Sequence, residues 1–177
     1  METLKKYTIF IIAALVIAIT FVFDKPTGME AVNTVAKSFK EMLFILPPVF
    51  ILLGLLDVWV PRDTMVKFMG QGSGLKGFLL AFFLGSAAAG PLYVVFPIAA
   101  AFMKKDVSFF NIMILIGAWS TTKIPMLLFE YGALGPRFTL TRLAMNIPII
   151  IIIAIAMKTL LSDSEVEAIY NTAKELN

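Results

Sequence analysis

Long apolar runs, separated by short polar stretches, recur along the whole chain. The spans that they predict cover about residues 7–23, 42–59, 75–103, 107–131 and 143–161. Runs of about 17 to 25 apolar residues are long enough to cross the ~30 Å hydrocarbon core of a bilayer as α-helices. We therefore expect an all-α membrane protein with about five transmembrane segments, which form one membrane domain over residues 1–161.

The first span begins after two lysines, an arrangement that also occurs in signal peptides. Lys5 and Lys6 precede the apolar run 7–23, which ends in Phe-Val-Phe-Asp-Lys-Pro. A cleavage site would need a small-x-small pattern, and none follows this run. The sequence favours an uncleaved transmembrane helix.

Two polar segments flank the hydrophobic region. Residues 24–41 place apolar side chains at helical spacing opposite lysines, which suits either a short interfacial helix or a solvated connector. Residues 162–177 are polar, and Ser162 and Glu165 have the spacing of a capping box. We expect a short polar helix at this end of the chain.

The two central apolar regions are each interrupted near the middle. Gly85, Gly90 and Pro91 divide residues 75–103, which as one straight helix would be about 43 Å long. This region is either a tilted, broken helix or a re-entrant pair of half-helices. Residues 107–131 carry a similar interruption, so the two regions resemble a weak internal repeat, and both are expected to be broken or re-entrant. Discontinuous helices of this kind are typical of transporters with inverted repeats.

The basic residues outside the spans give two topology counts. With five crossings, seven basic residues fall on each side of the membrane. If both central regions re-enter, the division becomes nine to five, with the N-terminus inside according to the positive-inside rule. Both counts place the two termini on opposite faces.

Two ionisable residues fall within the fourth span. Lys123 and Glu130 are seven residues apart, and therefore lie on one face of a helix. Ionisable groups inside a span are costly unless they are paired or hydrated. In the functional interpretation, Lys123 is a cation and Glu130 an acceptor in a solute or proton site. In the structural one, Glu130 lies at the interface and Lys123 snorkels or pairs with a partner subunit.

Small and polar residues complete the candidate pathway. They gather at the two interruptions and comprise Gly85, Ser86, Gly90, Pro91, Ser120, Thr121, Thr122 and Pro125. The glycines have an alternative role in close helix packing. The hydroxyls have an alternative role in satisfying carbonyls that Pro125 leaves without a donor.

Composition excludes several classes of function. The chain is 59% hydrophobic, 15% charged and has a mean hydropathy of +0.90, with no Cys and no His. Thiolate chemistry, a His base and nitrogen or sulfur zinc sites are therefore excluded. Ser120 and Lys123 have the spacing of a Ser–Lys dyad, but no second motif supports an enzyme. We expect no catalytic residue, cofactor or metal. Because long runs of Lys and Arg are missing, we also expect no nucleic-acid partner.

Two blocks carry a family resemblance. GPLYVVFPIAAA and GAWSTTKIP resemble the predicted permease family that includes YraQ and the organoarsenical efflux permease ArsP, and the similarity covers roughly residues 40–155. Full-length members look like two related halves, and this chain is similar to one half. The resemblance implies a multi-pass permease of the cell (inner) membrane. The cysteine motif of many relatives has no counterpart here, so the resemblance does not extend to recognition of arsenic by thiolates.

A chain of this size is expected to need a partner. Irregular backbone at membrane depth is tolerated only where protein buries it or where it lines a water-filled cavity. We therefore expect either a homodimer, possible in an antiparallel arrangement, or a pair with a companion half-permease. Either assembly would move a small solute of unknown identity. The alternative is a non-transporting accessory or scaffold subunit that requires a companion half.

Overall fold

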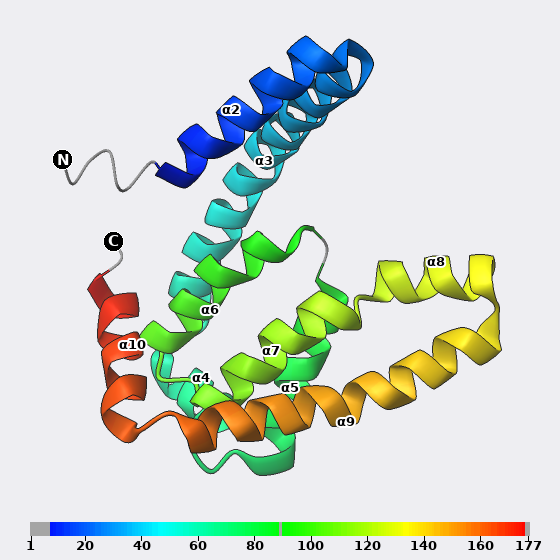
Figure 1. Ribbon diagram of the computed structural model, residues 1–177. Coiled ribbons are helices and arrows are strands. Elements are labelled where there is room, and N and C mark those ends of the chain that lie inside the picture. The colour runs from blue at the N-terminus through cyan, green and yellow to red at the C-terminus, as the bar shows by residue number, and fades with distance from the viewer. Residues whose placement is uncertain (1–7, 89, 176–177) are drawn as a thin grey trace. The chain divides into compact units, whose positions relative to one another are not determined.

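The fold is helical wherever the chain is described. The computed structural model describes residues 8–88 and 90–175, and every regular element in these ranges is a helix (Figure 1). The basic residues Lys5 and Lys6 before the first span lie outside these ranges. The chain divides into two compact units, Met1–Pro48 and Val49–Asn177.

The first unit is a helical hairpin. It contains α2 (Thr8–Phe23) and the part of α3 (Lys25–Trp59) that ends at Pro48. Asp24 joins the two helices and accepts hydrogen bonds from the Thr27 hydroxyl at 2.7 Å and the Thr27 N–H at 3.3 Å. These two bonds lower the pKa of Asp24, and the bond from the hydroxyl has the larger effect. The polar stretch 24–41 is therefore mostly helical and continuous with the expected second span, and α3 continues through Pro47 and Pro48.

The second unit is built around α7 (Phe109–Thr121). The other elements are the end of α3, α4 (Arg62–Met69), α5 (Gly74–Ala87), η1 (Leu92–Val94), α6 (Val95–Lys104), α8 (Ile124–Leu134), α9 (Pro136–Leu160) and α10 (Asp163–Glu175). α7 contacts α5, α6 and α9. Residues on several sides of α7 are buried, among them Ile112, Ile114, Leu115 and Ala118. A helix that is apolar on all sides is typical of such a central position.

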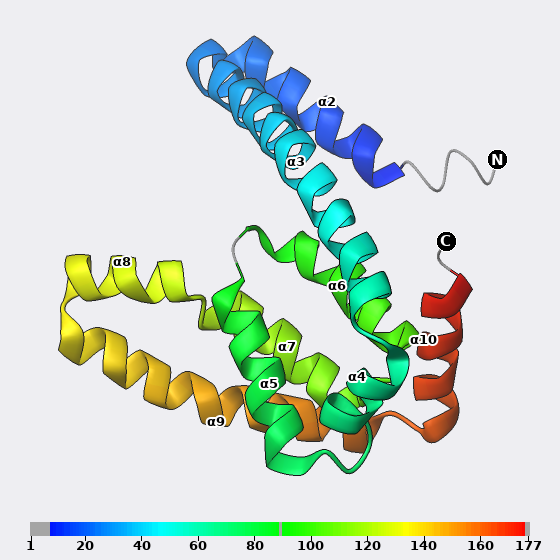
Figure 2. The same ribbon diagram turned by 180° about the vertical axis from the view of Figure 1, so that it is seen from behind.

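The first central region folds back on itself. Gly77 of α5 lies against Asn111, and Gly85, two turns later, lies against Leu115 and Ala118. α5 and α7 therefore run in the same direction, and α6, which connects them, must return (Figures 1 and 2). α5 has 14 residues, which at 1.5 Å per residue is about 21 Å and less than a ~30 Å bilayer core. The structure therefore has a hairpin of two helices here and not one continuous helix, and re-entry of this hairpin into the membrane stays a prediction.

The second central region is broken but does not fold back. α9 returns beside it, with Ile150 packed on Gly117. Within residues 8–88 and 90–175, two stretches are suited by length and composition to crossing a membrane, Phe109–Leu134 and Pro136–Leu160. α9 begins at Pro136 and not near Leu143, as the sequence indicated, because Gly135 turns the chain with a φ of +85° and proline is favoured in a first helical turn.

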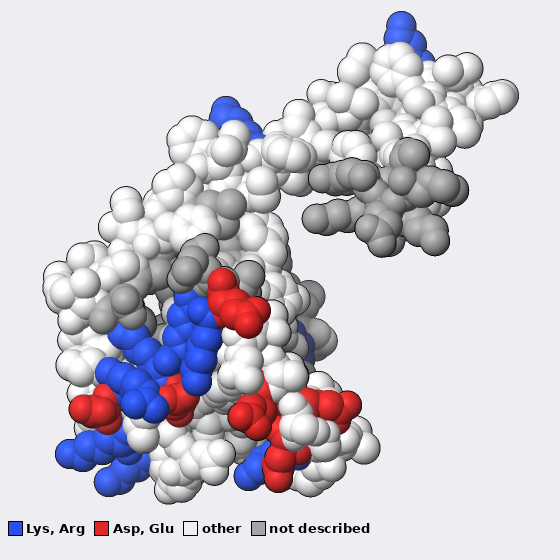
Figure 3. All heavy atoms as spheres, turned by 90° about the vertical axis from the view of Figure 1, so that its left-hand side faces the viewer, with Lys and Arg blue, Asp and Glu red and all other residues white. Residues whose placement is uncertain are grey.

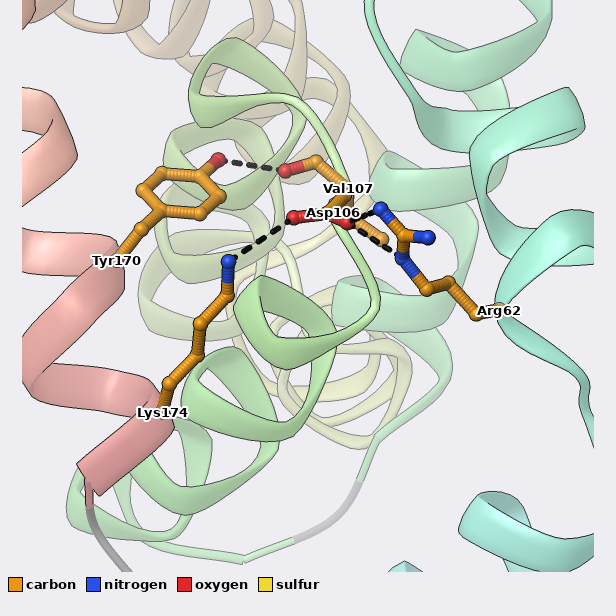
Figure 4. A network of polar contacts seen from close by, with 5 residues as sticks. All are labelled: Arg62, Asp106, Val107, Tyr170 and Lys174. Atoms are coloured by element: carbon orange, nitrogen blue, oxygen red, sulfur yellow. Dashed lines mark hydrogen bonds and ion pairs between the residues drawn. The ribbon is translucent and has the colours of Figure 1, made fainter.

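Charged side chains mark one end of this unit. Asp106, between α6 and α7, pairs with Arg62 of α4 and with Lys174 of α10, while the Tyr170 hydroxyl donates to Val107 O at 2.5 Å (Figure 4). Burial, followed by the nearby Asp106 carboxylate, raises the pKa of Tyr170 to about 12. Figure 3 shows charged side chains gathered where α4 and α10 lie.

α10 is capped as the sequence predicts. The Ser162 N–H donates to the Glu165 carboxylate at 2.8 Å, and the Glu165 N–H donates to the Ser162 hydroxyl at 3.4 Å. Hydrogen bonds from Ser162 lower the pKa of Glu165, and the bond from the hydroxyl has a larger effect than the bond from the N–H. The expected capping box is confirmed.

The folded-back region changes both topology counts. Those counts treated the two central regions alike, whereas one folds back and the other does not. Seven basic residues now belong to the α4–α10 end: Arg62, Lys67, Lys76, Lys104, Lys105, Lys158 and Lys174. Arg137 and Arg142 lie toward the α8–α9 turn. From the positive-inside rule, we expect the α4–α10 end to face the cytoplasm.

This orientation can be tested with single cysteines, because the native chain contains none. We expect Ala133→Cys, beside the α8–α9 turn, to react with a membrane-impermeant maleimide in intact cells. Asn171→Cys in α10 should react only after permeabilisation. The reverse labelling pattern would contradict the assignment, and the cysteine-free parent gives the background.

Gly85 provides a test of the α5–α7 contact. A Cβ at this position would lie 2.5 Å from Leu115 O. We expect Gly85→Ala to lower the free energy of unfolding by about 1–3 kcal/mol, as overpacking does in cores. Gly132→Ala is the matched control, since nothing lies within 4 Å of its Cβ position and the gain in helix propensity is the same. Equal midpoints of denaturation for the two variants in detergent would contradict the close contact.

Candidate functional site

The two interruptions of the central regions lie together. The Ser86 and Thr122 hydroxyl oxygens are 2.9 Å apart, and both residues are buried. Lys123 Nζ donates to Gly90 O at 2.6 Å. Trp119 Nε1 donates to Pro91 O at 3.3 Å. Three contacts thus join the break after α5 to the break after α7.

The first break follows from a glycine and a proline. Gly90 has a φ of +119°, a conformation that residues with a Cβ rarely adopt. Pro91 is extended and precedes η1, which leads directly into α6. Residues 90 and 91 therefore fix this turn of the hairpin. Lys123 binds the Gly90 carbonyl, and Trp119 binds the Pro91 carbonyl, which also accepts the Val94 N–H.

The second break is a short extended step between two helices. Thr122 ends α7, and Lys123 precedes α8, in whose first turn Pro125 lies. The Thr122 hydroxyl bonds to Ala118 O, and the Ser120 and Thr121 hydroxyls bond to Gly117 O, at 2.8–3.0 Å. These hydroxyls therefore bond within α7. The carbonyl that Pro125 leaves without a backbone donor is that of Thr121, four residues earlier, and none of the three hydroxyls binds it.

A buried ion pair supports the second break from α9. Arg142 Nε lies 2.8 Å from a Glu130 carboxylate oxygen, without the alignment of a hydrogen bond, and the side chains are 23% and 10% exposed. A second nitrogen of Arg142 donates to Thr121 O at 3.0 Å. One guanidinium thus connects α8 and α9 to the end of α7.

The structure separates the candidates that the sequence grouped. Lys123 and Glu130 have different partners, a backbone carbonyl and an arginine. Gly85 is buried in the α5–α7 contact, which is its packing role. Ser120 and Pro125 are exposed. The contact between the two breaks, called the junction below, is formed by Ser86, Gly90, Pro91, Thr122 and Lys123. A solute site at the junction stays a prediction.

Sequence reasoning missed two polar residues. Arg142 lies outside the spans predicted from the sequence, and Gly135 and Pro136 were the available signal that the helix begins earlier. Asn111 is 1% exposed and donates to Met69 O at 2.8 Å and to the Ser73 hydroxyl at 3.0 Å, joining the starts of α5 and α7. A lone amide in an apolar run was its only sequence signal.

A polar cavity lies away from the junction. It has a volume of about 350 Å³ and is lined by Gly70–Gly74, Ser108–Asn111, Lys158 and α10 residues, at the charged end of the unit. In residues 8–88 and 90–175, no group of three Asp or Glu side chains is placed to hold a metal ion.

The family comparison decides the broad class of the protein. A family model described as a predicted permease matches residues 28–177. The chain belongs to this family. The resemblance inferred from the two sequence blocks is therefore confirmed, and membership implies a membrane protein of the permease class. Comparisons with curated proteins and with solved structures give no match.

The Glu130–Arg142 pair can be tested by a double-mutant cycle. Removing one partner of a buried pair leaves an uncompensated charge, so Glu130→Gln and Arg142→Gln should each reduce stability by about 3–5 kcal/mol. The double variant should lose clearly less than the sum of the two, measured by denaturation in detergent. Additive losses would contradict a direct interaction.

Proposed function

We propose that the chain is a permease subunit that moves a small solute through the junction of its discontinuous helices. The observation that carries this proposal is the direct contact of the two backbone breaks through Ser86–Thr122 and Lys123–Gly90. Secondary transporters with broken helices bind their solutes at such midplane junctions. Membership in a permease family supports the same class.

The depth of the junction agrees with this role. Lys123 is the fifteenth residue of the 26-residue stretch Phe109–Leu134, and thus lies near the middle of a candidate span. The re-entrant hairpin reaches the same level from the cytoplasmic end, as oriented by its basic residues. A solute at the junction would therefore lie about equally far from the two faces of the membrane, as alternating access around a midplane site requires.

The junction is open on one side, which supports a partner. Ser120 is exposed and Lys123 is partly exposed, and beside them α8 presents Ile124, Leu128 and Phe129 to the surroundings. An exposed polar step flanked by large apolar residues suits coverage by protein more than by lipid alone. We propose that a second copy or a companion half-permease covers this face, within one membrane domain over residues 1–161 in the cell (inner) membrane. The alternative, an accessory subunit, differs in being inert until its companion is present.

A reversible crosslink across the junction tests this function. The purified full chain is reconstituted in liposomes, and the entry of acetate, inorganic phosphate, sulfate, glycerol and methylammonium is followed by shrink–swell light scattering. We expect entry of at least one solute above the protein-free rate. In Ser86→Cys/Thr122→Cys, oxidation should stop this entry and a reductant should restore it.

The single-cysteine variants, treated with the same oxidant and reductant, are the matched controls. Entry that continues through the oxidised double variant would contradict a path at the junction. A chain that is inert alone but active with a companion half would favour the accessory function.

A further inference from the structure

The junction contains a lysine whose charge is not balanced. Lys123 precedes α8 inside the apolar stretch Phe109–Leu134, and its Nζ donates to the uncharged Gly90 carbonyl. Within residues 8–88 and 90–175, Lys123 forms no ion pair. A cation at this depth is costly unless it is hydrated or finds an anion.

The other charges near the junction cancel. Glu130 is the nearest acidic residue in α8, and its carboxylate is paired with Arg142 of α9. Arg142 also donates to the Thr121 carbonyl, so the guanidinium is held on the α7–α9 side. Together these two residues contribute no net charge, and the described part of the junction carries one positive charge, that of Lys123.

The helix ends do not alter this balance. α5 and α7 end at the junction, whereas η1–α6 and α8 begin there. Two helix C-termini and two N-termini contribute opposed partial charges of similar size. The hydroxyls of Ser86 and Thr122, which lie beside the same break, are neutral and bond to each other, and the Thr122 hydroxyl also donates to Ala118 O. The lysine therefore sets the sign of the electrostatic potential.

We propose that the solute of this permease is a small anion, for which Lys123 is the counter-ion at the junction. This inference rests on the proposed permease function. An anion would replace or share the contact of Lys123 Nζ with Gly90 O. A cation would meet the uncompensated ammonium and be repelled, while a neutral solute would leave the charge unbalanced.

Two substitutions at residue 123 separate charge from shape. Lys123→Gln removes the charge but keeps an amide N–H that can donate to Gly90 O. Lys123→Arg keeps the charge. Lys67→Gln, on α4 away from the junction, is the control for a general loss of positive charge.

Transport is measured with the probes used above, in liposomes that hold the full chain. We expect acetate, phosphate or sulfate to enter, and glycerol and methylammonium to stay at the protein-free rate. Lys123→Gln should raise the half-saturating concentration of the anion about 100-fold or more, as loss of a buried charge partner does. Lys123→Arg and Lys67→Gln should remain within about threefold of the native chain.

Binding is measured separately, by the shift that each anion causes in the thermal midpoint of the purified chain at constant ionic strength. We expect a shift for the native chain and Lys123→Arg, and a smaller one for Lys123→Gln. An equal shift in Lys123→Gln, or no shift for any of the three anions, would overturn the anion site.

Failure of the anion proposal can be distinguished from failure of the proposed permease function. Entry of glycerol or methylammonium alone, stopped by the oxidised Ser86→Cys/Thr122→Cys pair, would overturn the anion proposal and leave the permease function standing. Anion binding that requires Lys123, without entry of any probe, would keep the site and contradict transport by the chain alone.

Discussion

The close packing of α5 against α7 is the constraint on which the rest of the second unit depends. Gly85 allows backbone contact near the ends of the two helices, and Asn111 joins their starts to Met69 and Ser73. Because the helices are parallel, the segment between them must return, and α6 therefore forms the second arm of a hairpin. The same register places Ser86 opposite Thr122, so the contact that fixes the hairpin also brings the two breaks together.

Polar groups at the junction are satisfied mainly by other parts of the chain. Helix breaks inside an apolar region expose carbonyls, and each unpaired carbonyl is costly in a medium of low polarity. Lys123 and Trp119 bind the carbonyls of the first break, and Arg142 binds one at the second. Hydroxyls of α7 bind carbonyls of their own helix. The breaks are thus supported from both sides, which is the condition under which irregular backbone persists at this depth.

The charged end has a different role from the junction. Asp106 connects α4 and α10 through Arg62 and Lys174, so the turn between α6 and α7 is held by elements that lie far apart in the sequence (Figure 4). Lys105 Nζ donates to Val60 O at 2.6 Å and so ties the same turn to the end of α3. The hairpin is anchored where it leaves the polar end, while its tip lies among neutral groups and Lys123.

The sequence by itself determined the helical class, the family and the positions of both breaks. Apolar length and period predict helices directly, and Gly90, Pro91 and Pro125 disfavour a continuous helix through purely local geometry. The capping box at Ser162 and Glu165 was predictable for the same reason, since its partners are three residues apart. Only the tertiary structure decided that the first region folds back, that Arg142 pairs with Glu130, and that Lys123 meets Gly90. Those contacts join residues 12 to 33 positions apart, and their geometry depends on the direction in which whole helices pack, which local pattern does not encode.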